Sequence, residues 1–256
     1  MKLGWKVQIR RVAMARFDDY HRTVIGYHGT GLSTALRIVN RFQTFRASER
    51  KYDWLGSGIY FWEYAPSQAL DFARIRQRQY LRKKNKTKDD LLRASEPLAV
   101  VASMIRLGYC LDLTEPENIR YMEAVFRDYS ESMALTGDPL PKNTRKYRKL
   151  DRDIFEYTYK QLESVEPKRI VDTARGIYVP TDGAKRVWPA SWISKDTHIQ
   201  LCVRNPASIL GTWLHYPTVL GVDDASKTFQ DAAVDLGHAN SQSQDSTGED
   251  DAPEKD

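Results

Sequence analysis

The sequence predicts an α+β domain, because strand-like and helix-like patterns fall in separate parts of the chain. Short apolar runs typical of strands dominate residues 97–114 and 168–214, whereas helical periodicity dominates residues 31–92 and 115–165. A wound parallel sheet would instead need strands and helices that alternate. Hydrophobic residues make up 41% of the chain and aromatic residues 11%, which is enough for a core. We therefore expect residues 1–229 to form one domain.

The first part of this domain predicts a strand and two helices. Residues 23–30 (TVIGYHGT) form a β-rich run that ends at a glycine. Residues 32–42 (LSTALRIVNRF) then place apolar residues on one helical face, with Ser33 or Thr34 as the expected N-cap. Residues 65–86 predict a second helix, because a proline stands in the first turn and an apolar stripe follows it.

The second part predicts more strands around a helical segment. Residues 98–113 (LAVVASMIRLGYCLDL) contain a buried strand, which we expect a turn near Gly108 to divide in two. Residues 115–165 read as a helical insert with a basic loop. Residues 197–213 (THIQLCVRNPASILGTW) predict a central strand, a turn and a final short strand.

Composition indicates a cytoplasmic protein. Residues 1–14 (MKLGWKVQIRRVAM) lack the apolar segment of a signal peptide, and no apolar run is long enough to span a membrane. The two cysteines, Cys110 and Cys202, lie in apolar runs, so we expect two reduced core thiols. No cluster of His, Cys and acidic residues has metal-ligand spacing, and no metal is predicted.

Charge is unevenly distributed along the chain. Residues 230–256 hold eight acidic residues and one lysine, and we expect them to form an acidic disordered tail. The remainder carries 38 Lys and Arg against 26 Asp and Glu, with basic runs at residues 74–88 and 142–149. Such a body favours anionic partners, nucleic acid among them.

Two glycine-containing motifs suggest a binding site. The first is His28-Gly29-Thr30 at a strand end, where glycine leaves the backbone open to a flat ligand. The second is residues 56–61 (GSGIYF), where two glycines lead into an aromatic strand. Together with the intervening helix, residues 25–73 resemble the NAD-binding half of the ADP-ribosyltransferase superfamily, in its diphtheria-toxin-like and poly-ADP-ribose-polymerase-like branch. The resemblance implies two packed, mostly antiparallel sheets that form an NAD cleft flanked by helices.

The resemblance also implies roles for the motif residues. His28 would hydrogen-bond the adenosine ribose, and backbone atoms of Gly29 would pair with the nicotinamide amide. Thr30 would make a lesser polar contact with NAD, and Gly58 belongs to the same cofactor site. Tyr60 would stack on the nicotinamide ring, whose positive charge suits an electron-rich face.

Several further residues have two readings. A small hydroxyl side chain near the start of the second helix helps to bind the amide in relatives; Ser67 is the nearest match, and Gln68 is its rival. Arg175 either contacts the NAD pyrophosphate or forms an internal ion pair with Asp172. Glu63 either caps a helix or supplies a missing carboxylate.

The catalytic assignment departs from the family pattern. Relatives commonly place a glutamate beside the ribose at the start of a late strand, and this strand has none. Gln200 is the candidate in its place, with His198 as second choice; both would act beside Tyr60. The lack of a carboxylate favours the transfer of a single ADP-ribose. Asp53 and Trp54 precede the second motif, in a loop expected to cover the pocket.

The resemblance implies a mono-ADP-ribosyltransferase that uses NAD as co-substrate. It also implies an intracellular microbial toxin or defence effector, whose acceptor is a macromolecule and, from the basic body, more readily RNA or DNA than protein. An antitoxin or chaperone that binds the acidic tail would fit this role. Two alternatives remain open: a non-enzymatic module that binds NAD or ADP-ribose, and an NAD-dependent RNA 2′-phosphotransferase.

Overall fold

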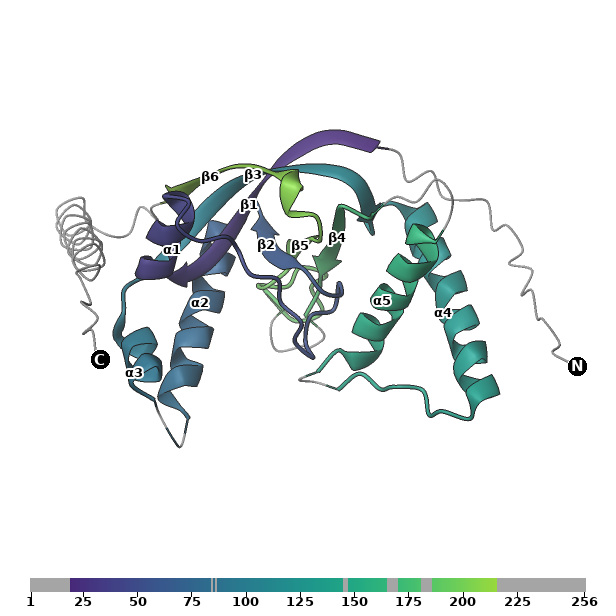
Figure 1. The fold of residues 1–256 in the computed structure, drawn as a ribbon. Coiled ribbons are helices and arrows are strands. Elements are labelled where there is room, and N and C mark those ends of the chain that lie inside the picture. The colour runs from purple at the N-terminus through teal and green to yellow at the C-terminus, as the bar shows by residue number, and fades with distance from the viewer. Residues whose placement is uncertain are drawn as a thin grey trace, which may run out of the picture. The chain divides into compact units, whose positions relative to one another are not determined.

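A computed structural model describes residues 19–83, 85, 87–144, 147–164, 170–180 and 186–215 (Figure 1). The strands are β1 (Asp19–Gly31), β2 (Ile59–Glu63), β3 (Leu98–Asp112), β4 (Thr173–Tyr178), β5 (His198–Val203) and β6 (Ile209–His215). The helices are α1 (Leu32–Val39), α2 (Pro66–Leu81), α3 (Lys88–Ser95), α4 (Pro116–Thr136) and α5 (Lys149–Glu163), and a 3-10 helix covers Pro206–Ser208. The predicted acidic tail at 230–256 and the start of the predicted domain lie outside the described residues.

The six strands form one mixed sheet in the order β1-β2-β5-β4-β3-β6, which confirms the α+β class. Only β3 and β4 pair in parallel among these strands. The expected division into two sheets is not seen in the described part of the chain. The reason is the length of β3: it pairs with β1 along most of its 15 residues, with β6 through Val100–Ile105 and with β4 through Cys110–Asp112. Since β1 also pairs with β2, the pairings close into a ring.

The predicted turn at Gly108 is wrong, because β3 runs through this position without a break. Gly108 has a φ of 60°, and a Cβ at this position would lie 2.4 Å from Oδ2 of Asp172. The same carboxylate oxygen accepts a hydrogen bond from the backbone N–H of Tyr109 at 2.9 Å. The glycine therefore lets a distant aspartate dock on the strand rather than ending it.

The helices group at the two ends of the sheet, with α1, α2 and α3 at one end and α4 and α5 at the other (Figure 1). Helices α4 and α5 lie within residues 115–165, where helices were expected. The N-cap of α1 differs from the prediction: Gly31 holds this position without a side-chain bond, and the Ser33 hydroxyl donates to Glu96 at 2.7 Å. None of the described helices is long and apolar enough to cross a bilayer.

The core residues include both cysteines. Cys110 and Cys202 are free and buried. Burial raises the pKa of the Cys110 thiol to about 12, and burial also raises the pKa of the Cys202 thiol. Both thiols are therefore protonated at neutral pH, as expected for core residues.

Candidate active site

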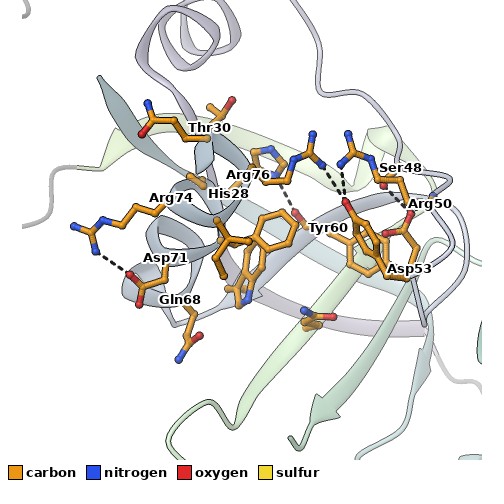
Figure 2. A pocket seen from close by; sticks show the side chains of 18 of the residues that line it. His28, Thr30, Ser48, Arg50, Asp53, Tyr60, Gln68, Asp71, Arg74 and Arg76 are labelled. Carbon is orange, nitrogen blue, oxygen red and sulfur yellow. Dashed lines mark hydrogen bonds and ion pairs between the residues drawn. The ribbon is translucent and has the colours of Figure 1, made fainter. Parts of the chain in front are cut away.

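A cavity of about 860 Å³ lies between α2 and the loop of residues 46–54 (Figure 2). The ends of β1, β2 and β5 complete its lining. Alternation along the paired strands explains which side chains reach it: Tyr60 and Trp62 of β2 and Gln200 of β5 line the cavity, whereas Phe61 is fully buried in the core behind them. The volume falls within the range of small-molecule sites.

The two glycine-containing motifs meet in this cavity. Nδ1 of His28 lies 2.9 Å from the backbone oxygen of Tyr60, a residue 32 positions away. Because a carbonyl only accepts, Nδ1 carries the proton and Nε2 of the neutral ring is left as an acceptor. Burial lowers the pKa of His28, which favours this neutral form at physiological pH. The ring is thereby prepared to accept a hydrogen bond from a ligand hydroxyl.

Tyr60 is fixed by its own loop. Its hydroxyl donates to the backbone oxygen of Gly56 at 2.8 Å and accepts from the backbone N–H of Leu55 at 3.0 Å. Burial raises the pKa of Tyr60, so the hydroxyl stays protonated. With its polar end satisfied, the residue contributes an aromatic surface to the cavity and no titrating group.

Close backbone packing explains both glycines assigned to the cofactor. A Cβ on Gly29 would lie 1.9 Å from the backbone oxygen of Ala69, so this position must be glycine for α2 to approach β1. Gly29 and Thr30 both line the cavity. A Cβ on Gly58 would lie 2.4 Å from Sγ of Cys202. Gly58 is not among the lining residues, and its role is to let β2 pack beside β5.

Gln200, the first choice for catalysis, lies in the cavity wall. Its Oε1 accepts a hydrogen bond from Nε1 of Trp54 at 2.5 Å, which joins the covering loop to β5. Because an indole nitrogen only donates, this bond also fixes which end of the amide is the oxygen. The amide NH₂ and the second lone pair of Oε1 are the groups left for a ligand.

His198 lines the same cavity through a different set of contacts. Its ring stacks on Tyr178, with centroids 5.0 Å apart, and its Nδ1 lies 2.6 Å from the backbone oxygen of Asp196. Nε2 is buried and has no hydrogen-bond partner within the described structure. Burial lowers the pKa of His198, so the ring is neutral and Nε2 is an unused acceptor.

Comparison with known proteins gives no match to a family model, a curated protein or a solved structure. The function therefore rests on the geometry and chemistry of the cavity.

Arg175 does not belong to the cavity. Its guanidinium is buried and pairs with Glu63, at 2.5 Å and 2.9 Å, and with Asp112 at 3.1 Å. The predicted internal ion pair of Arg175 is therefore present, but its partners are Glu63 and Asp112 and not Asp172. Asp172 instead accepts hydrogen bonds from Tyr109 and Asn205. Glu63 is equally engaged, so neither residue is available to a ligand in the cavity. A contact of Arg175 with a pyrophosphate thus has no support in the structure.

On the second helix, Gln68 lines the cavity and Ser67 does not. Of the two candidates that the sequence offered at this position, Gln68 is the one that lies at the cavity (Figure 2). Ser67 sits at the second position of α2, two residues before Ala69, which contacts Gly29, and no described hydrogen bond links its hydroxyl to the cavity.

Sequence reasoning missed the arginines of the cavity. Seven described arginines line it: Arg46, Arg50, Arg74, Arg76, Arg78, Arg93 and Arg148. The basic run at 74–88 was a visible signal for the helix, but nothing in the loop of residues 46–50 marked its arginines. The carboxylate of Asp53, in the same loop, accepts hydrogen bonds from the Ser48 hydroxyl, at 2.6 Å, and from the Arg50 backbone N–H. The described residues contain no group of three or more potential metal ligands.

Proposed function

We propose that the protein is an NAD-dependent mono-ADP-ribosyltransferase with the fold of that superfamily. One observation carries the proposal: the His28 and Tyr60 motifs join through a hydrogen bond and both line one cavity of nucleotide size. In this proposal Nε2 of His28 accepts from the adenosine ribose, the backbone of Gly29 pairs with the nicotinamide amide, and Thr30 makes a lesser polar contact with NAD. Tyr60 stacks on the nicotinamide ring.

The reaction would break the bond between nicotinamide and ribose. The electron pair of that bond leaves with nicotinamide, and positive charge develops on the ribose as an oxocarbenium-like state. The acceptor nucleophile then bonds to the anomeric carbon and loses its proton to solvent or a base. Oxygen Oε1 of Gln200, held by Trp54, is the acceptor dipole that we place beside the developing charge. Because an amide is weaker than a carboxylate in this role, we infer the transfer of one ADP-ribose.

We infer that the acceptor is a nucleic acid rather than a protein. Seven arginines line the cavity, and they add to a body with a large basic excess. The segment that leads into β5 also exposes aromatic rings: Trp192 is 99% exposed and Trp188 is 55% exposed. Surfaces that bind single strands combine basic side chains with exposed aromatic rings, which act by charge and stacking. Such an activity fits an intracellular toxin or defence effector.

The arginine-rich lining supports one other function. An NAD-dependent RNA 2′-phosphotransferase would need arginines and histidines around its pocket, and this cavity has both. The aromatic wall at Tyr60 favours the transferase. Chemical products separate the two, because a phosphotransferase removes a 2′-phosphate from RNA, whereas the proposed enzyme adds ADP-ribose. A module that only binds NAD would release no nicotinamide.

The proposal is tested by incubating the protein with adenylate-labelled NAD and separate pools of RNA, DNA and protein. We expect label in the nucleic-acid pools and its loss in His28→Ala and Gln200→Ala. Gly211→Ala is the matched control, because a Cβ there meets no atom within 4 Å. Label in no pool would refute the transferase. Label in protein alone would refute the nucleic-acid acceptor, and unchanged labelling by Gln200→Ala would move the catalytic role to another residue.

A further inference from the structure

Two arginines from different elements converge on one phenol oxygen at the rim of the cavity. Nη1 of Arg50, in the covering loop, donates to Oη of Tyr52 at 2.6 Å. Nη1 of Arg76, on α2, donates to the same oxygen at 3.0 Å. In Figure 2 the guanidinium groups of Arg50 and Arg76 lie next to each other, and dashed lines join both to one oxygen. All three residues line the cavity.

These two arginines have no ion-pair partner among the described residues. Within the described structure neither guanidinium forms an ion pair, whereas Arg74 and Arg93, which line the same cavity, pair with Asp71 and Asp89 at 2.8 Å and 2.7 Å. The carboxylate of Asp53 lies in the same loop and feels the charge of Arg50, but its hydrogen bonds come from the Ser48 hydroxyl and from the Arg50 backbone. Two like charges held close together repel each other unless solvent or an anion compensates them.

Tyr52 adds a third donor. A phenol oxygen has two lone pairs and one hydrogen, and the two arginines occupy both lone pairs. Burial raises the pKa of Tyr52, so the hydrogen is retained. None of the described groups accepts a bond from this hydroxyl. The site therefore presents guanidinium N–H groups and one O–H group, and it offers no acceptor of its own.

We propose that Arg50, Tyr52 and Arg76 form a binding site for a diphosphate group, that of the dinucleotide in the cavity. Planar guanidinium groups bind phosphate oxygens in pairs, and two of them side by side suit two linked phosphates. A site within a cavity of nucleotide size favours a nucleotide over the backbone of a nucleic-acid strand, which needs an open groove. The choice of a dinucleotide rests on the proposed function. These residues would then contact the pyrophosphate, the role that the sequence suggested for Arg175.

Titration calorimetry of the 256-residue chain tests this site with ADP, ADP-ribose, inorganic pyrophosphate and adenosine. We expect Arg50→Gln and Arg76→Gln each to weaken ADP and ADP-ribose binding by about 10-fold, as expected for a lost charged hydrogen bond, and the double variant more. Adenosine binding should not change. Tyr52→Phe keeps both charges and should weaken ADP binding less. Arg127→Gln, an exposed arginine on α4 outside the cavity lining, is the matched control.

Three results would overturn the site: unchanged ADP affinity in the double variant, equal loss of ADP and adenosine binding, or no binding of any phosphate probe by the wild-type protein. Unchanged ADP affinity together with a loss of RNA labelling would assign the arginines to the acceptor instead. The two proposals fail separately. Loss of ADP binding in the double variant, without nicotinamide release by the wild type, keeps the site and refutes the transferase. If the wild type releases nicotinamide and the double variant still does so, the transferase is kept and the diphosphate site is refuted.

Discussion

The ring of His28 and the backbone of Tyr60 are joined by a hydrogen bond of 2.9 Å between Nδ1 and the carbonyl oxygen. This bond links the end of β1 to β2, strands that pair only at Gly26–Glu63 and Tyr27–Trp62. It also sets the tautomer of the histidine, and hence which ring nitrogen is offered to a ligand. The contact is thus both part of the fold and part of the candidate site.

Gly29 should be the least tolerant glycine of the site. In Gly29→Ala the new Cβ would lie 1.9 Å from the backbone oxygen of Ala69, so α2 must move away from β1. We expect unfolding at a lower temperature, with a loss of about 2 kcal/mol or more, as for other overpacked positions. Nicotinamide release should also fall. Calorimetry of Gly29→Ala beside Gly211→Ala checks this, and equal melting temperatures would contradict it.

Arg175 should be important for stability and not for binding. Arg175→Met leaves the buried carboxylates of Glu63 and Asp112 without their partner. Breaking such a pair costs about 3–5 kcal/mol. The control Arg120→Met removes an exposed pair with Glu117 and should cost less than about 1 kcal/mol. Urea unfolding measures both; a small effect at Arg175, or a specific loss of ADP binding with stability intact, would refute the assignment.

Stability should fall as the pH drops below the ordinary histidine pKa. Burial lowers the pKa of His28 and His198, so the unfolded chain binds more protons than the folded protein just below pH 6.5. In that window each histidine contributes at most about 1.4 kcal/mol per pH unit, and the half-buried His198 contributes less. Burial raises the pKa of Asp53, which acts in the opposite direction from about pH 4 upward.

This predicts a lower melting temperature at pH 5.5 than at pH 7.5. His28→Asn should lower the melting temperature at both pH values but reduce the difference between them. Thermal scans of the two proteins at both pH values give the comparison. An undiminished difference in His28→Asn would show that the histidine does not change its protonation on folding.

The bond between Trp54 and Gln200 should hold the catalytic amide. Trp54→Phe keeps a ring beside Gly176 but removes the indole N–H, and we expect nicotinamide release to fall by about 10-fold while stability changes by only about 1 kcal/mol. Nicotinamide release by Gln200→Leu should fall by at least as much. Gln200→Glu retains an acceptor for Trp54 and adds negative charge, so release should be retained or increased. Wild-type rates in Gln200→Leu would contradict this role.

Local patterns were sufficient to predict the elements that frame the cavity. The apolar run before His28, the proline at the start of α2 and the alternation of His198, Gln200 and Cys202 all depend on near neighbours. Each pattern corresponds to an element in the structure. The meeting of the two motifs followed from a resemblance to a family, and their hydrogen bond is a finding of the structure.

Contacts between distant residues explain what the sequence could not show. Gly108 has the signature of a turn, yet its conformation serves the docking of Asp172, 63 positions beyond Tyr109. The partner of Arg175 lies 112 positions away on β2, so no local spacing could indicate it. The convergence of Arg50 and Arg76 on Tyr52 depends on how the loop lies against α2, which composition does not determine.

The central claim is that this cavity binds NAD and breaks its bond to nicotinamide. The most direct test is chromatographic detection of nicotinamide released from NAD by the 256-residue chain, with and without RNA, beside His28→Ala and Gly211→Ala. We predict release that RNA accelerates, a loss of at least about 10-fold in His28→Ala, and wild-type rates in Gly211→Ala. Absence of nicotinamide under all these conditions, or equal release by His28→Ala, would contradict the claim.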